Sequence, residues 1–115
     1  MNRFGTTLLI GLVALCACSR KPEVYSIGVS QCSEDAWRDA ANNEILLEAS
    51  FYDNLSVEVK SVADDSEQQI ADIEEFIAEG VDLLIISPNE SETLAPVVEK
   101  AYDAGIPVIL FDRRV

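Results

Sequence analysis

Histidine is absent from the chain of 115 residues, as are a glycine-rich phosphate loop and a nucleophile elbow. Histidine is the commonest general acid and base in enzymes, and glycine-rich loops often hold phosphate groups. These absences argue against an enzyme, so we expect no catalytic residue and no cofactor. Asp64 and Asp65 are adjacent carboxylates without the regularly spaced oxygen ligands of a calcium loop, so we expect no metal site.

Positive charge is scarce. The chain has 8 basic and 21 acidic residues, which gives a formal net charge of −13 at pH 7. A surface of this charge repels a phosphate backbone, so nucleic acid is not expected as a partner. The acidity is typical of a solvated surface that keeps an exported protein soluble.

A hydrophobic run long enough to cross a membrane is also missing. The apolar run at 4–17 covers 14 residues, whereas a bilayer span needs roughly 20. Arg3 precedes this run, and the string from Leu15 to Cys18 resembles a bacterial lipobox with Cys18 as the lipidated residue. An uncleaved signal anchor and a buried core helix are the alternatives.

This N-terminus predicts a protein that is held at a membrane in the periplasm. The expected organisation is a signal peptide with a lipobox at 1–18, a linker at 19–23 and a folded domain at 24–115. If Cys18 carries a lipid, Cys32 is alone in the domain and cannot form an internal disulfide. We interpret Cys32 as an inert small residue.

The remaining chain alternates short apolar runs with segments of helical periodicity. The run at 81–86 lacks polar alternation, which indicates a parallel strand covered by helices on both faces. Gly80 and Gly105 each end a helical segment and are followed at once by the next strand. The expected strands are 24–30, 55–62, 81–86 and 108–111.

The three intervening segments are expected to be amphipathic helices. Side-chain oxygens for the start of the second helix are offered by Asp64, Asp65 and Ser66, and Ser66 with Gln69 three residues later has the pattern of a capping box. Pro96 must lie in the first turn of the third helix, whose cap is then near Ser91 or Thr93. The apolar stripes are Trp37, Ala41, Ile45, Ala49 and Tyr52 in the first helix, Ile70, Ile73 and Ile77 in the second, and Leu94, Val97, Val98, Ala101 and Tyr102 in the third.

Together these elements predict an α/β fold, a doubly wound parallel sheet of the type βαβαβαβ. Such sheets bind ligands beyond the carboxyl ends of their strands. At these positions the chain has SQCSEDAW, SPNES and DRRV, three polar segments with one aromatic side chain among them. Their convergence predicts a single binding site. A response-regulator receiver is less suitable, because it needs acidic residues where this chain has Ser30 and Gln31.

The segments IGVSQCSEDAW, DLLIISPNES and AGIPVILFDR resemble the N-terminal lobe of the type I periplasmic sugar-binding proteins, the ribose-binding and repressor-core family. The first segment is closer still to the periplasmic input domains of hybrid two-component sensors. The resemblance covers Tyr25 to Arg113 and implies a truncated N-terminal lobe. In this family Asp112 and Arg113 would bind sugar hydroxyls, Trp37 would stack on the sugar ring, and Glu34 would make a polar contact.

Gln31 and Asn89, which follow the first and third strands, complete the expected site. Several of these residues also have purely structural interpretations. Asp112 and Arg113 fit a solvated strand end with a local ion pair, and Trp37 fits packing of the first helix. Glu34 and Asp35 fit a helix N-terminus with Ser33 as its cap, and Asn89 fits a turn.

The resemblance implies periplasmic monosaccharide binding, as the sensory input region of a sugar-responsive two-component sensor of which this chain is a fragment. A lipid-anchored binding protein of a sugar ABC transporter and an interaction lipoprotein that binds no sugar also fit. The implied partners are a sugar, a missing second lobe or downstream membrane kinase region, or a transporter permease. Because one lobe supplies only one wall of the cleft, we expect weak binding and a tendency to associate through uncovered surface.

Overall fold

The structure, a computed structural model, describes residues 23–115. The expected signal peptide, the lipidation at Cys18 and nearly all of the expected linker lie outside the described residues. From 23 onward, no helix is long and apolar enough to cross a membrane. The elements are β1 (Tyr25–Gln31), α1 (Ala36–Ala49), β2 (Leu55–Ser61), α2 (Ser66–Glu79), β3 (Leu83–Ser87), α3 (Ser91–Asp103) and β4 (Val108–Leu110).

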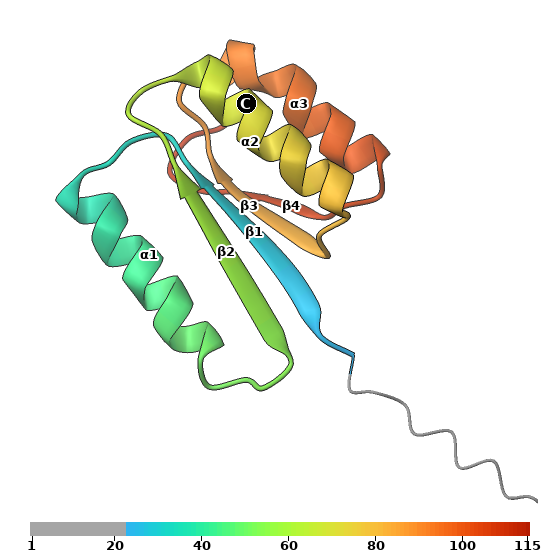
Figure 1. The fold of residues 1–115 in the computed structure, drawn as a ribbon. Coiled ribbons are helices and arrows are strands. Elements are labelled where there is room, and N and C mark those ends of the chain that lie inside the picture. The colour runs from blue at the N-terminus through green and yellow to red at the C-terminus, as the bar shows by residue number, and fades with distance from the viewer. Residues whose placement is uncertain (1–22) are drawn as a thin grey trace, which may run out of the picture.

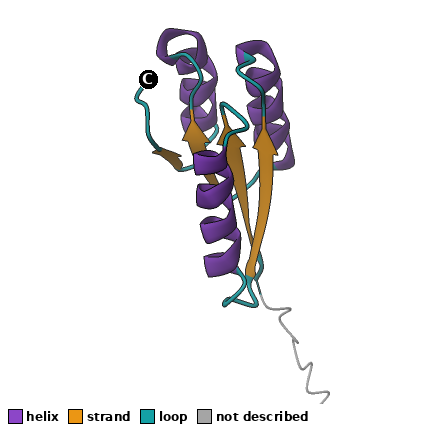
Figure 2. Cartoon of the chain, turned by 90° about the vertical axis from the view of Figure 1, so that its left-hand side faces the viewer, coloured by secondary structure: helices purple, strands orange, loops and turns teal. Residues whose placement is uncertain are grey.

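The strands form one parallel sheet in the order β2-β1-β3-β4, and the arrows of the long strands point the same way in Figure 2. Figure 1 shows α2 and α3 side by side on one face of the sheet and α1 on the other face. The predicted α/β doubly wound fold is therefore confirmed, and every strand lies within two residues of its expected bounds. A parallel sheet brings all strand carboxyl ends to one edge.

The main core lies between the sheet and the pair α2 and α3. Its largest fully buried side chains include Phe76 and Ile73 from α2 and Leu84 from β3. Gly28 in β1 allows Phe76 to approach closely, since a Cβ at this position would lie 2.8 Å from Phe76 Cγ. A glycine inside a strand here serves close packing between the sheet and a helix.

The helix ends differ in part from the expectation. Asp35, and not Ser33, caps α1, because its carboxylate accepts hydrogen bonds from the backbone N–H groups of Trp37 and Arg38. Asp65, one of the three residues expected to offer a capping oxygen, caps α2, so Ser66 is the first helical residue and the predicted capping box with Gln69 does not form. Gly80 adopts a φ of 70° and ends α2 as predicted.

The beginning of α3 also corrects a prediction. The helix starts at Ser91 after the N-cap residue Glu90, which places Pro96 in the second turn and not in the first. Pro96 is exposed and remains within the helix. The structure shows no side-chain hydrogen bond that caps this helix.

The face of α1 that meets the sheet is more polar than expected. Ala41, Ile45 and Ala49 are half-buried, but Trp37 is 56% exposed and Tyr52 is 50% exposed. The predicted stripe is therefore wrong at its two ends.

The buried residues of the helix are Arg38 and Asn42. Polar groups from the strands lie beneath the N-terminal half of α1, so polar helix residues are the ones that fit there.

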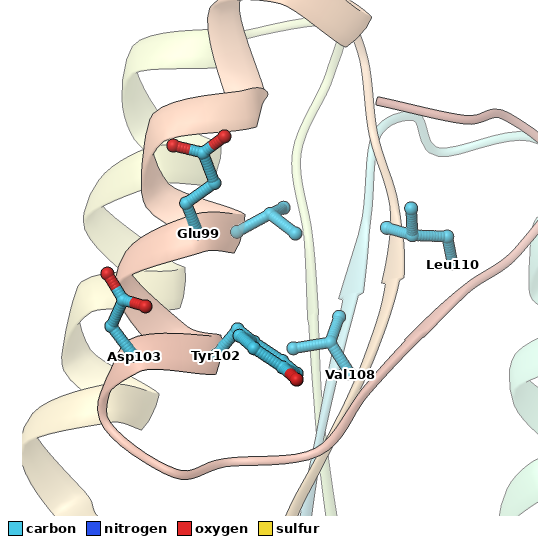
Figure 3. Close-up of a pocket in the computed structure, with 6 residues that line it drawn as sticks. Glu99, Tyr102, Asp103, Val108 and Leu110 are labelled. Carbon is cyan, nitrogen blue, oxygen red and sulfur yellow. The ribbon is translucent and has the colours of Figure 1, made fainter.

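Apolar hollows open at the β4 edge of the sheet and beside α1. Figure 3 shows the first, of about 400 Å³, where Val108 and Leu110 of β4 face Tyr102 of α3 and the acidic residues Glu99 and Asp103 lie beside it. The second, of about 460 Å³, lies between the C-terminal half of α1 and the beginnings of β1 and β2. Both indicate sheet surface that the described helices cover incompletely.

Candidate functional site

Arg38, in the first turn of α1, connects the carboxyl ends of the strands. Its Nη1 donates a hydrogen bond of 2.9 Å to the Ser87 hydroxyl at the end of β3. Its Nη2 donates one of 2.8 Å to the Asp112 carboxylate beyond β4, and its Nε donates one of 2.7 Å to the Ser33 hydroxyl before α1. One side chain therefore holds together the three polar segments that follow the strands.

The Arg38 guanidinium is also the buried charge of this site. Its side chain is 6% exposed, whereas the Asp112 side chain is 37% exposed. Burial acts to lower the pKa of Arg38, but the hydrogen bond and attraction of Asp112 raise the pKa above its ordinary value. Asp35 adds a second carboxylate at 3.6 Å from Nε. Arg38 therefore stays charged and directs Asp112 while leaving part of that carboxylate open to solvent.

An aromatic surface lies beside this ion pair. The Trp37 and Phe111 rings stack with centroids 5.5 Å apart and an interplanar angle of 10°. The Arg38 guanidinium carbon lies 5.3 Å from the centroid of the Trp37 ring. Because Trp37 remains 56% exposed, its indole offers an apolar surface to solvent. Trp37 and Asp112 thus lie at the same end of the sheet, as a shared site requires.

Asp112 begins a tight turn after β4. Its φ of 69° lies in the left-handed region, where aspartate is one of the few residues other than glycine found with some frequency. Arg113 follows, and its Nη1 donates a hydrogen bond of 2.5 Å to the Asn89 carbonyl, while its Nε lies 4.0 Å from Asp112 Oδ2. The Arg113 side chain is 48% exposed. Asp112 and Arg113 are thus neighbours with their polar groups near the same rim.

The three other expected site residues differ in how deeply their side chains are buried. Glu34 is exposed in the loop between β1 and α1. Asn89 is half-buried, and its side chain donates a hydrogen bond of 2.9 Å to the Ser66 hydroxyl. Gln31 is 0% exposed and its Nε2 donates to Asn42 Oδ1 at 2.7 Å. Gln31 therefore lies beneath the other expected site residues.

Within the described residues, the Gln31 carboxamide is hydrogen-bonded through its nitrogen but not through its oxygen. Its Oε1 is buried and has no hydrogen-bond partner among residues 23–115. Asn42, which holds the other end of this carboxamide, has its own Nδ2 3.5 Å from the Ser61 hydroxyl of β2. This polar layer under α1 supports the rim from below.

Sequence reasoning missed Arg38, Ser87 and Gln69. A signal for Arg38 was present, because Arg38 and Asn42 are four residues apart and both fall on the same side of the helix as Ala41 and Ile45. Two polar residues at that spacing inside an otherwise apolar stripe indicate a polar surface beneath it. Two partners of Arg38, Ser87 and Asp112, lie 49 and 74 positions away in the sequence, and only the sheet brings them close.

Comparisons with known proteins give a consistent result. The family model described as "Periplasmic binding protein domain" matches residues 27–114. The D-ribose/D-allose-binding protein of Pseudomonas aeruginosa is 33% identical over 129 residues, which covers 99% of this chain and 40% of that protein. A galactofuranose-binding protein of Escherichia coli is 35% identical over 91 residues, which covers 78% of this chain and 28% of that protein.

Solved structures agree. A fructose-binding periplasmic domain of a hybrid two-component system is 55% identical with a TM-score of 0.77, and the match covers 79% of this chain and 30% of that one. A galactofuranose-binding protein is 34% identical with a TM-score of 0.72, over 79% of this chain and 31% of that one. The chain therefore spans well under half the length of the proteins it matches.

Proposed function

The chain belongs to the family of periplasmic binding protein domains, and from this premise we propose that it forms part of the N-terminal lobe of a domain that binds a monosaccharide. The observation that carries the proposal is the Arg38 guanidinium, which holds the Asp112 carboxylate beside the exposed Trp37 indole. The proposed contacts with the sugar come from Asp112, Arg113, Trp37 and Glu34. Gln31 and Asn89 would support these contacts from beneath and from the side.

The chemistry of these groups suits a sugar. A carboxylate such as Asp112 accepts hydrogen bonds from two hydroxyl groups, whereas the guanidinium of Arg113 only donates. Hydrogen bonds to charged groups contribute roughly 1.5–3 kcal/mol each. The C–H face of a sugar ring is apolar and fits the exposed indole of Trp37. One face of the ligand and its hydroxyl edge would thus be recognised by neighbouring side chains.

Arg38 supplies what Asp112 needs for this role. A sugar hydroxyl can donate to the Asp112 carboxylate only where that carboxylate has a free lone pair pointing toward the sugar. The Arg38 guanidinium donates a hydrogen bond of 2.8 Å to one oxygen of the Asp112 carboxylate, and its fixed position on α1 orients that carboxylate. Ser33 and Ser87 hold the guanidinium itself. Arg38 is therefore proposed as a positioning residue for Asp112.

Within this function we favour the sensory input region of a two-component sensor. The supporting observation is the 55% identity with the periplasmic domain of a hybrid two-component system. The alternative, a binding protein of a sugar transporter, is supported by relatives named as sugar-binding proteins and as ABC transporter components. A signal peptide with lipidation at Cys18 would place either at a membrane, with a kinase region or a permease as partner.

The coding sequence downstream of this segment distinguishes these possibilities. A reading frame that continues through a second lobe, a membrane span and a kinase region supports the sensor. A second lobe followed by a stop codon and neighbouring permease genes supports the transporter. A reading frame with neither would contradict both and leave an interaction lipoprotein.

The binding proposal is tested by Asp112→Asn in the 115-residue chain. We expect millimolar affinity for the unmodified chain, because a ligand held by one lobe stays half solvated. Asp112→Asn removes the charge at nearly constant shape and should weaken binding about tenfold. D-fructose, D-ribose and L-arabinose are titrated by NMR, with the sole tryptophan, Trp37, as an additional probe.

Asp103→Asn is the matched control, since Asp103 is an exposed carboxylate that lines the hollow between α3 and β4. It should leave affinity unchanged. Equal affinity of the Asp112→Asn variant and the unmodified chain would remove Asp112 from the site. Failure of the unmodified chain to bind any of the three sugars at near-molar concentration would contradict the proposed function for this chain.

A further inference from the structure

Gln69 is a buried side chain whose hydrogen bonds all go to the carboxyl-terminal parts of β1 and β3 and to the loop that follows β3. It lies in the first turn of α2 and is 0% exposed. Its Nε2 donates to the Ser30 hydroxyl at 3.1 Å and to the Ser87 carbonyl at 2.9 Å, which ties α2 to the ends of β1 and β3. Its Oε1 accepts a hydrogen bond of 2.9 Å from the Asn89 backbone N–H.

Asn89 connects Gln69 to Arg113 through two groups of its backbone, the N–H and the carbonyl. Its side chain donates to the Ser66 hydroxyl at 2.9 Å, so Asn89 is attached to α2 at two points, Gln69 and Ser66. Its carbonyl then accepts the hydrogen bond of 2.5 Å from Arg113 Nη1. The orientation of the Asn89 peptide therefore determines where this acceptor lies for the Arg113 guanidinium.

Arg113 needs such an anchor. Its side chain is 48% exposed and has several rotatable bonds, so an unanchored guanidinium would lose considerable rotamer freedom on binding a ligand. A guanidinium that is already oriented binds more tightly, because less ordering remains to be done. The carboxylate of Asp112 alone does not orient Arg113 closely, since Nε lies 4.0 Å from it.

We propose that Gln69 is a positioning residue for Arg113, acting through the backbone of Asn89. The relevance of this inference to sugar binding rests on the proposed function. The hydrogen bonds from Gln69 to Asn89 and from Asn89 to Arg113 are independent of any ligand. It extends the site to a residue of α2, which contributes no group to the rim. The side chain predicted to cap the helix instead sets the geometry of the β3–α3 loop.

The test uses Gln69→Met, which keeps a side chain of similar length and removes both the donor and the acceptor. Ile73→Val is the matched control, because Ile73 lies one turn further along α2 and is also 0% exposed. It lowers stability by loss of core volume and has no hydrogen bond to the loop. Both variants and the unmodified 115-residue chain are studied by nitrogen-15 NMR.

The first readout needs no sugar. Gln69→Met should accelerate hydrogen exchange at the Asn89 amide and move the Arg113 Nε–Hε signal toward that of a freely rotating arginine. Ile73→Val should leave both signals unchanged although it lowers the melting temperature. An Arg113 signal that is unchanged in Gln69→Met overturns the inference, whatever the outcome for sugar binding.

The second readout is a double-mutant cycle with D-fructose as the probe. Gln69→Met should weaken binding about threefold to tenfold in the unmodified background and less than about twofold in the Arg113→Met background. Equal losses in both backgrounds would overturn the inference, since Gln69 would then act by a route other than Arg113. Failure of the unmodified chain to bind would contradict the proposed function, and the Arg113 signal alone would then decide.

Discussion

Arg38 is buried because oxygen atoms from other segments of the chain accept the hydrogen bonds that its nitrogens donate. These acceptors are the Ser33 and Ser87 hydroxyls and the Asp112 carboxylate. A buried charge without such partners would be strongly destabilising, so the burial of Arg38 and the arrangement of the three loops depend on each other. The residue that organises the site is thus also part of what holds the domain together.

Replacement of Arg38 should therefore affect stability as well as binding. Arg38→Met fills the space but leaves the three oxygen partners without their donor, and we expect a loss of about 1–3 kcal/mol in the free energy of unfolding. Arg38→Lys restores the charge without the planar fork and should recover only part of this loss. Urea unfolding followed by Trp37 fluorescence measures both, and equal stability of Arg38→Met and the unmodified chain would contradict this account.

Asp35 makes the start of α1 sensitive to acid. The Ser33 hydroxyl, and then the backbone N–H groups of Arg38 and Trp37, hold the pKa of Asp35 below its ordinary value of 3.8. A carboxyl whose pKa is lowered by folding stabilises the protein above its unfolded pKa, and this contribution is lost as the pH falls through the folded pKa. Stability should thus decrease below about pH 4.

Asp35→Asn separates this contribution from the other carboxylates. Asparagine can still cap the helix but does not titrate, so the variant should lose less stability between about pH 5 and about pH 3 than the unmodified chain. Urea unfolding at both pH values gives the comparison, and a carbon-13 titration reports the Asp35 pKa directly. A pKa at or above 3.8 would contradict the proposed role of these hydrogen bonds.

At the level of elements, the two faces of the sheet are packed in different ways. The pair α2 and α3 covers an apolar face, where Ile73, Phe76 and Leu84 are 0% exposed. On the other face, α1 meets a polar layer at its N-terminal half and half-buried apolar residues at its C-terminal half. The apolar face supplies most of the hydrophobic stabilisation, whereas the polar face carries the site.

Gly28 sets the distance between β1 and α2. In Gly28→Ala the new Cβ would lie 2.8 Å from Phe76 Cγ and 2.9 Å from Leu84 Cδ2, so the helix or these side chains must shift. We expect a loss of about 1–3 kcal/mol in the free energy of unfolding. Phe76→Ala should make the same glycine substitution less costly, because alanine lacks the Cγ and Cδ1 atoms that the new Cβ would meet.

The control for this prediction is Ser56→Ala. Ser56 is an exposed residue of β2, so its replacement should change stability by less than about 0.5 kcal/mol. Chemical unfolding of the variants gives the four corners of a double-mutant cycle for Gly28 and Phe76. A harmless Gly28→Ala would show that the helix can move away from the sheet without cost.

For the molecule as a whole, uncovered apolar surface and net charge act in opposite directions. Ile109 in β4 is 50% exposed and Tyr102 in α3 is 74% exposed, near the free edge of the sheet. Such an edge favours pairing with another chain, whereas a charge of −13 opposes association. Because salt screens the charge more than it weakens apolar contact, association should increase with ionic strength.

We therefore expect the 115-residue chain to associate at high concentration, and more strongly at high salt. Sedimentation velocity over a range of protein and salt concentrations measures this. Ile109→Lys should reduce association by placing a charge on the edge strand, whereas Ala78→Lys changes the net charge equally at an exposed position of α2 and should not reduce association. A monodisperse monomer under all conditions would show that the edge is protected in another way.

The sequence by itself determined the alternation of strands and helices, the end of α2 at Gly80 and the polar character of the strand ends, because these depend on local periodicity and turn chemistry. Resemblance to a known family also led to the prediction that Asp112, Arg113 and Trp37 are site residues. Only the tertiary structure decided which helix residues are buried, since Arg38, Asn42 and Gln69 are stabilised by partners from distant strands. A polar residue looks solvent-exposed in a local pattern until the sheet supplies its hydrogen-bond partner.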